Sequence, residues 1–465
     1  MKKIKPLSLL TFIFFFTSLL PAQHITEKVK NLWNDPLLKQ RIEDGIRTNR
    51  MGDFTIRFVN EKGETVQVEN LKIEQIKHEF LFGSNAFMNK GFPTEAENEK
   101  YEKTFASIFN FATIPFYWNT LEPKEGELRF TKDSKPIYRR PAPDLVLEFC
   151  DKYDITPKGH TLVWDDKKFF IPDWLPENKD VREKAQAKRI DQIAERYNDK
   201  INYWDVANEP SDKRRDILMP NDFFFKGFKE AERVFSSNNK FIINITSHVW
   251  ERPLREYGAA ECGQDYLMVE NTILKKAKVD IIGLQMHFIS ESIWKSTLIG
   301  EVYTPDRIFN ILDLFSRFNL PIHITEYSNP AYPEGKIGEE NQAFLAENFY
   351  KLLFSYPNVE AITWWNIVDK TAPILIPSDN PWESSYDLGG LVNRDFSPKP
   401  SYIALDRLIN KEWKTNLSFT EKLNNKRFKC FYGNYKITCQ VNGKKITKEI
   451  MLSKKGTSTQ TIIIK

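Results

Sequence analysis

Residues 201–210 read INYWDVANEP, an apolar and aromatic run that ends in the polar pair Asn208 and Glu209. Short runs of this kind, rich in β-branched and aromatic residues, are typical of buried strands. The chain contains eight of them, and a helical pattern of ten residues or more follows each one. The expected strands span residues 80–85, 109–116, 155–164, 201–208, 241–246, 280–287, 322–326 and 361–367. The expected helices span residues 95–107, 143–152, 181–197, 222–234, 264–277, 305–317, 340–354 and 401–410.

This alternation predicts an α/β fold, a (β/α)8 or TIM barrel, over residues 80–411. The chain has 465 residues, of which 41% are hydrophobic, so it can bury the large core that a barrel requires. In such barrels the active site forms at the carboxyl ends of the strands. Polar residues at those ends are therefore the candidates for chemistry.

The two flanks of the barrel have a different pattern, with the period of two that strands show. Alternating stretches occur at residues 54–59 and 65–68, within an N-terminal segment at 24–79. Further ones follow the barrel within residues 412–465. We expect a small β-sandwich-like module at the C-terminus, which the N-terminal strands would complete. Its role is either to cap the barrel or to bind carbohydrate, and the scarcity of aromatic residues favours capping.

Residues 1–23 resemble a secretory signal peptide, with lysines at positions 2, 3 and 5 and an apolar run at 7–20. The alternative, a membrane anchor, needs about 20 apolar residues. No later segment is apolar for long enough, so we expect no stable membrane span and a secreted or periplasmic, bacterial protein. The net charge falls from +4 to +1 when the three lysines leave with the leader. Nucleic acid is therefore not an expected partner, because phosphate binding requires a basic face.

The chain has four cysteines, too few for a disulfide framework. Cys430 and Cys439 flank an expected hairpin turn, where they either form a disulfide or remain two separate small apolar side chains. Cys150 and Cys262 fall in helical patterns and are expected as buried thiols.

Two carboxylates stand at strand ends that a barrel places nearly opposite one another. Glu209 ends the fourth strand, and Glu326 ends the seventh. A pair of carboxyl groups in unequal environments can cleave a glycosidic bond, one as acid and base and the other as nucleophile. The alternative is that each glutamate pairs with a neighbouring lysine or arginine. The polar and aromatic residues at the other strand ends favour the catalytic interpretation.

Those residues are of the types that bind sugars, since amides and imidazoles bond hydroxyl groups and tryptophan packs on a pyranose face. Any one tryptophan is more often part of the core. The substrate-binding candidates are His160, Trp164, Asn208, Gln285, His287, Trp365, Tyr117, Trp118 and Trp382.

Other chemistries lack their signatures. The histidines of the predicted rim lie on separate strands, with no His-x-His or His-Glu-x-x-His spacing, so no metal is expected. A Gly-x-Ser-x-Gly elbow and phosphate-binding glycine loops are also missing, and we expect no cofactor.

The motifs GHTLVW at 159–164, DVANE at 205–209, GLQMH at 283–287 and ITE at 324–326 together resemble family 10 of the glycoside hydrolases, the endo-β-1,4-xylanase family. The resemblance extends over about 330 residues and includes the closing motif at 398–402. It implies a retaining enzyme with Glu209 as acid/base and Glu326 as nucleophile. It also implies that Asn208 contacts the sugar beside the scissile bond, and that the substrate is a polysaccharide or oligosaccharide, by default xylan.

The segment after the second strand departs from the family pattern. Where the xylanases carry Glu-Asn-x-x-Lys-Trp, this chain has TIPFYW at 113–118. Polar sugar contacts have thus become apolar or aromatic, which predicts an altered preference for the sugar. Another β-glycan or a decorated, aryl-bearing oligosaccharide is therefore an alternative substrate, and a non-catalytic carbohydrate-binding protein is a third possibility.

Overall fold

The computed structural model describes residues 24–464 except 213–217, 252–262, 289 and 373–384. The expected signal peptide, Cys262 and Trp382 lie outside the described residues. No helix in the described ranges is long and apolar enough to cross a membrane.

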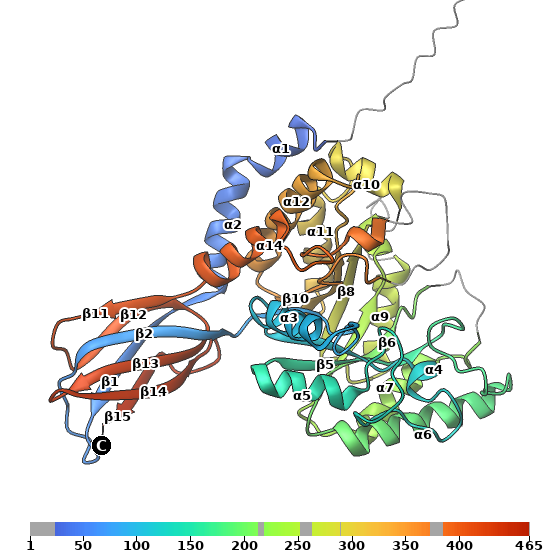
Figure 1. The fold of residues 1–465 in the computed structure, drawn as a ribbon, viewed down its shortest axis with the longest axis horizontal. Coiled ribbons are helices and arrows are strands. Elements are labelled where there is room, and N and C mark those ends of the chain that lie inside the picture. The colour runs from blue at the N-terminus through green and yellow to red at the C-terminus, as the bar shows by residue number, and fades with distance from the viewer. Residues whose placement is uncertain (1–23, 213–217, 252–262, 289, 373–384, 465) are drawn as a thin grey trace, which may run out of the picture.

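Eight parallel strands form a closed barrel at the centre of the fold (Figure 1). They coincide with the eight expected strands to within three residues at either end, which confirms the TIM barrel. Around the barrel they follow the order β10-β3-β4-β5-β6-β7-β8-β9. Their bounds are β3 Leu81–Asn85, β4 Phe111–Pro115, β5 Thr156–Trp164, β6 Tyr203–Asn208, β7 Lys240–Ile245, β8 Ile281–His287, β9 Ile322–Ser328 and β10 Val359–Trp364.

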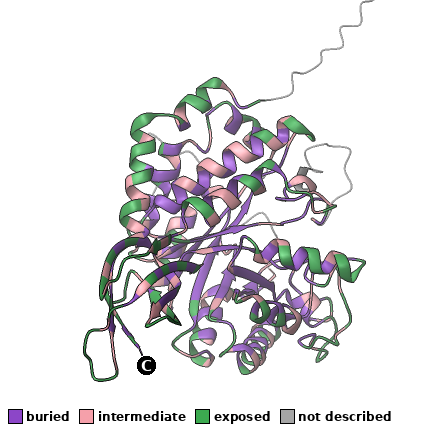
Figure 2. Ribbon diagram, turned by 60° about the vertical axis from the view of Figure 1, so that its left-hand side comes forward, coloured by how far each residue is buried: buried purple, intermediate pink, exposed green. Residues whose placement is uncertain are grey.

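Helices surround the barrel and bury one face each, so that their outer faces are exposed and the strands are buried (Figure 2). Local sequence fixes several helix starts. Thr94 and Glu97 form a capping box at α3, and α5, α11 and α14 begin with proline. The helices that follow the strands are α3 Glu95–Ala106, α5 Pro143–Tyr153, α6 Lys179–Tyr197, α7 Phe223–Val234, α9 Gln264–Leu274, α11 Pro305–Ser316, α12 Lys336–Ser355 and α14 Pro400–Arg407. Shorter turns are α4 Trp118–Leu121, α8 His248–Glu251, α10 Glu291–Leu298, the 3-10 turn Ser385–Leu388 and the π-helical turn Leu408–Glu412.

Two N-terminal helices, α1 (Glu27–Trp33) and α2 (Pro36–Asn49), precede the barrel and were not expected from the sequence. Packing against α12 holds them in place. The Trp33 ring lies 5.3 Å from that of Phe349. Gly45 approaches the backbone so closely that a Cβ there would lie 2.7 Å from the carbonyl oxygen of Ser355. Helices this short depend on tertiary contacts more than on propensity, which is why the sequence pattern alone did not reveal them.

Strands from both ends of the chain form a β-sandwich beside the barrel (Figure 1). One sheet has the order β12-β1-β15 and the other β11-β2-β13-β14. N-terminal strands thus lie between C-terminal ones in both sheets. The bounds are β1 Met51–Val59, β2 Glu69–His78, β11 Asn416–Phe419, β12 Asn425–Phe431, β13 Gly433–Val441, β14 Lys444–Leu452 and β15 Thr459–Ile463.

Cys430 and Cys439 both point into the sandwich core as free, buried thiols. They lie on β12 and β13, in different sheets, and form no disulfide in this structure. Cys150 on α5 is also a buried free thiol, as expected.

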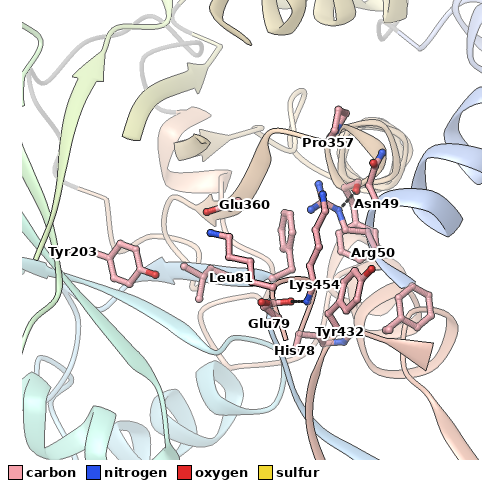
Figure 3. Close-up of a pocket in the computed structure, with 14 residues that line it drawn as sticks. Asn49, Arg50, His78, Glu79, Leu81, Tyr203, Pro357, Glu360, Tyr432 and Lys454 are labelled. Carbon is pink, nitrogen blue, oxygen red and sulfur yellow. Dashed lines mark hydrogen bonds between the residues drawn. The ribbon is translucent and has the colours of Figure 1, made fainter. Parts of the chain in front are cut away.

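Arg50, between α2 and β1, joins the sandwich to the barrel (Figure 3). Its buried guanidinium donates hydrogen bonds to the carbonyl oxygens of Phe354, Tyr356 and Val359. A cavity of about 220 Å³ beside it is lined by the amino-terminal ends of β3, β6 and β10 and by sandwich residues such as Lys454. The sandwich therefore meets the barrel at the end opposite to the carboxyl ends of the strands.

Candidate active site

Glu209 and Glu326 converge on one side-chain amide at the carboxyl end of the barrel. Nε2 of Gln285, on β8, lies 3.1 Å from Oε1 of Glu209 and 3.2 Å from Oε1 of Glu326. The two carboxylate oxygens cannot be farther apart than these lengths laid end to end, about 6.3 Å. The barrel thus brings together two residues that are 117 positions apart, although β7 and β8 separate their strands.

The backbone at Glu209 adopts a φ of 50°, in the left-handed region that residues other than glycine seldom occupy. Its N–H donates to the carbonyl oxygen of Asn244 on the next strand, at 2.8 Å. Such conformations persist where the surrounding structure enforces them, which is frequent at active sites.

Glu326 is 5% exposed and accepts hydrogen bonds from three side chains. Besides Gln285, these are Nδ2 of Asn244 at 2.9 Å and Nε2 of His287 at 3.1 Å. Burial would raise the pKa of this carboxyl, but the hydrogen bond from His287 and the nearby His160 and Lys158 outweigh it and lower the pKa below the ordinary value of 4.5. The group is therefore held in the ionised form that a nucleophile needs.

Asn244 was not among the candidates from the sequence. It lies on β7, is fully buried, and donates from Nδ2 to Oδ1 of Asn208 at 2.7 Å as well as to Glu326. Its own Oδ1 accepts from the hydroxyl of Thr325 at 2.5 Å. A polar residue inside the apolar run FIINI at 241–245 was the signal that could have revealed it.

A buried ion pair between Lys158 and Asp205 supports the His160 ring. Its Nδ1 lies 2.8 Å from Oδ2 of Asp205, and Nζ of Lys158 lies 2.8 Å from the same oxygen. Burial would raise the pKa of Asp205, yet the Lys158 charge and the His160 hydrogen bond lower it overall. Asp205 is therefore a charged anchor that fixes the orientation of the His160 ring, as second partners do for reactive histidines.

Aromatic rings form the opposite wall of the site. The Trp365 ring, after β10, lies 5.2 Å from Phe87, 5.6 Å from His160 and 6.3 Å from His287. Burial raises the pKa of the Tyr117 hydroxyl far above its usual value of 10.0, so this ring is a neutral surface. The cavity between this wall and the two carboxylates measures about 250 Å³. Its lining is Phe87, Tyr117, Arg139, Arg140, His160, Trp164, Phe169, Asn208, Glu209, His287, Glu326, Ser328, Pro330, Trp365, Asn366, Ala372 and Gly389.

The structure thus gathers seven of the sequence candidates around Glu209 and Glu326: six line the cavity, and Gln285 reaches both carboxylates from beneath. Trp118 is different, and its expected role was wrong. Its side chain is 1% exposed, its Nε1 donates to Glu122 at 2.9 Å, and its ring packs on Phe170 and Trp174. Tyr117, the residue before α4, lines the cavity, whereas Trp118, the first residue of α4, packs in the core. In the described part of the chain, no three His, Cys, Asp or Glu side chains gather as metal ligands.

The model of the glycosyl hydrolase family 10 matches residues 73–407, which contain the whole barrel and every site residue named above. The chain belongs to glycosyl hydrolase family 10. Solved structures that resemble the chain include xylanase 10B from Thermotoga maritima, which matches 72% of this chain and 96% of its own with a TM-score of 0.56 and 22% identity. Xylanase 10B from Thermotoga petrophila RKU-1 in complex with xylobiose matches 72% and 95%, with a TM-score of 0.57 and 21% identity. These likenesses show the fold.

The curated relatives are about one quarter identical. The Arabidopsis thaliana protein endo-1,4-beta-xylanase 5-like is 25% identical over 82% of this chain and 59% of its own. Endo-1,4-beta-xylanase B from Thermotoga neapolitana is 23% identical over 68% and 85%. The anti-sigma-I factor RsgI6 from Acetivibrio thermocellus is 26% identical over 84% of this chain and 46% of its own. The chain therefore spans about half the length of some of the relatives it matches.

Proposed function

We propose that this family 10 protein is a retaining glycoside hydrolase that cleaves internal β-1,4 bonds of xylan by double displacement. Glu326 is the nucleophile and Glu209 the acid/base. The observation that carries the proposal is the single Gln285 amide that bonds both carboxylates.

The separation of the carboxylates supports retention of configuration. Inverting enzymes hold their carboxyl groups roughly 6.5–9.5 Å apart, because a water molecule must fit between one of them and the sugar. Because Gln285 bonds both carboxylates, Oε1 of Glu209 and Oε1 of Glu326 lie no more than about 6.3 Å apart, which favours the closer of the two arrangements. Retaining enzymes need roughly 5–5.5 Å, so that one carboxylate can reach the anomeric carbon directly.

In the first step, a Glu326 oxygen attacks the anomeric carbon while Glu209 gives its proton to the departing glycosidic oxygen. A covalent glycosyl-enzyme forms and the aglycone leaves. In the second step, Glu209 takes a proton from water, the water oxygen attacks the same carbon, and Glu326 departs as a carboxylate. Asn244 and His287 hold Glu326 in line for both steps, and Asn208 and His160, which line the cavity, would bond sugar hydroxyls.

The xylanase names of the relatives and the xylobiose-bound neighbour support xylan as the substrate. A second candidate keeps the mechanism but changes the glycan to another β-glycan or an aryl-bearing oligosaccharide. The wall made by Phe87, Tyr117 and Trp365 supports it, because Tyr117 belongs to the segment in which the family has polar sugar contacts.

Purified protein incubated with xylan and a panel of other β-glycans tests the proposal, with Glu326→Ala as the control. We expect xylo-oligosaccharides from the wild type and none from the variant. Products from another β-glycan but not from xylan would favour the second candidate. Oligosaccharide binding without turnover of any substrate would instead indicate a non-catalytic carbohydrate-binding protein.

Secretion to the periplasm or the medium is also part of the proposal, since it would bring the enzyme to its polymeric substrate. The docking of the sandwich at the far end of the barrel supports a capping role for this module. Mass spectrometry of the exported protein tests for cleavage after residue 23.

A further inference from the structure

Two arginines with no role in the proposed reaction line the active-site cavity. Arg139 and Arg140 belong to the connection between α4 and α5, which folds back over the barrel mouth. The guanidinium carbon of Arg140 lies 3.8 Å from the ring centre of Tyr117 and 5.3 Å from that of Phe87. Arg139 lies 5.5 Å from the Phe87 ring. Both charges are thus held against the aromatic wall, on the side of the cavity formed by β10, β3 and β4.

Neither arginine forms an ion pair with a carboxylate in the part of the chain that the structure describes. Arg139 is 4% exposed; its Nη1 donates to the carbonyl oxygen of Thr371 at 2.6 Å, and its buried Nε has no acceptor there. Arg140 donates from Nη1 to the carbonyl oxygen of Arg139 at 2.9 Å. Burial raises the pKa of the nearby Asp387, and the charges of Lys370 and Arg139 only partly oppose this rise. Burial lowers the pKa of Arg139 to about 10, so both side chains still carry their charge at neutral pH.

The surrounding loop is built to hold this pair in place. Arg129, only 7% exposed, donates to the carbonyl oxygens of Thr120 at 2.7 Å, Lys135 at 2.9 Å and Arg140 at 3.1 Å. Arg139 adopts a φ of 58°, in the left-handed region. One buried arginine thus fixes the backbone that presents two others. A buried charge such as that of Arg139 is costly unless it is paired, and a carboxylate on a ligand would supply the missing partner.

We propose that Arg139 and Arg140 bind the carboxylate of a uronic acid residue carried by the glycan. The proposal rests on the glycosidase function above and specifies its substrate as an acidic, uronate-decorated β-glycan. A guanidinium matches a carboxylate in shape and charge and can bond both of its oxygens. Neutral sugars offer hydroxyl groups, which satisfy donors but leave both positive charges uncompensated.

The test uses two oligosaccharides with the same neutral β-1,4-xylose backbone, one of which carries a single glucuronic acid branch. We expect the wild type to have a higher kcat/KM on the acidic substrate. Arg140→Gln should lower kcat/KM on the acidic substrate at least about tenfold more than on the neutral one, as for a lost hydrogen bond to a charged group. Arg140→Lys should retain only part of the preference for the acidic substrate, because lysine keeps the charge but lacks the planar pair of donors that a guanidinium offers to a carboxylate. Lys135→Gln removes one exposed charge from the same loop and should leave the ratio unchanged.

Equal losses on both substrates in Arg140→Gln would overturn the proposal, since they would show that Arg140 only supports the Tyr117 ring. Equal wild-type rates on both substrates would overturn it as well, and so would a preference for a sulfated over a uronate branch. These outcomes leave the proposed hydrolase intact.

Calorimetry separates this proposal from the catalytic one. With Glu209→Gln as the binding protein, the acidic oligosaccharide should bind more tightly than the neutral one, and added salt should reduce the difference. If Glu209→Gln binds the acidic sugar more tightly while the wild type hydrolyses neither substrate, the uronate site is sustained and the proposed hydrolase fails. Equal binding of the two sugars would overturn the uronate site whatever the turnover.

Discussion

Asn244 donates a hydrogen bond of 2.9 Å from Nδ2 to Oε1 of Glu326, and neither residue is more than 5% exposed. The same nitrogen lies 2.7 Å from Oδ1 of Asn208, the residue before Glu209. One amide on β7 therefore aligns the proposed nucleophile with the segment that carries the proposed acid/base. Asn244 touches no cavity surface itself, so it acts by positioning.

Replacing Asn244 by alanine should lower kcat by about 10- to 100-fold with little change in KM, because a small misplacement of the attacking oxygen affects the transition state more than substrate binding. Steady-state kinetics on xylo-oligosaccharides measures this. Asn239→Ala is the control: Asn239 is equally buried and bonds Asn198 through its amide, away from the carboxylates. It should lower Tm without the kcat effect. A KM effect alone in Asn244→Ala would contradict the positioning role.

The two carboxylates should respond differently to the leaving group. Glu326→Ala should abolish turnover of every substrate. Glu209→Ala should lower kcat/KM about 10²- to 10⁴-fold on xylo-oligosaccharides, whose leaving alkoxide needs a proton. On an aryl glycoside with a strongly acidic phenol the loss should be less than about tenfold, because that phenolate leaves unprotonated. Similar losses on both substrates would mean that Glu209 is not the acid.

His287 should set the acidic limb of the pH profile. Its hydrogen bond helps to hold the pKa of Glu326 below 4.5, whereas burial acts in the opposite direction. In His287→Phe the ionised form loses this bond, so the pKa of Glu326 rises and the acidic limb of kcat/KM should move up by about one pH unit. Ser328→Ala removes only the partner of His287 Nδ1, at 2.6 Å, and should move the limb less. An unmoved limb in His287→Phe would refute this account of the nucleophile.

His323 should make the fold sensitive to acid. It is 1% exposed, burial lowers its pKa to about 3, and both ring nitrogens lack a partner among the described residues. The unfolded chain takes up a proton below the ordinary pKa of 6.5 while the folded chain does not. His323 therefore makes its full contribution to the free energy of unfolding above pH 6.5. This contribution falls by about 1.4 kcal/mol per pH unit as the pH drops toward 3.

His323→Leu should accordingly flatten the loss of stability between about pH 6 and pH 4. Urea unfolding at several pH values measures this dependence. His24→Leu, at an exposed position, is the control and should leave the slope as in the wild type. A slope in His323→Leu as steep as that of the wild type would show that other groups cause the acid sensitivity.

The sequence by itself determined the barrel and its two carboxylates. Apolar runs alternate with helical periods, and this local pattern survives in the folded chain because each strand and helix buries the face that the pattern marks. Glu209 and Glu326 could be found because parallel strands in a barrel end at one rim, so polar residues after those strands must meet.

Only the tertiary structure decided which side chains are hydrogen-bonded to one another at the carboxyl end of the barrel. Asn244 lies within an expected strand and was not among the candidates. Trp118 was a sugar-binding candidate like its neighbour Tyr117, but Trp118 packs in the core and only Tyr117 lines the cavity. Arg139 and Arg140 lie in a connection without periodicity, and closure of the barrel places them against Tyr117 and Phe87. Periodicity reports which face of an element is buried, whereas bonding partners and uncompensated charges depend on contacts between residues that are distant in the chain.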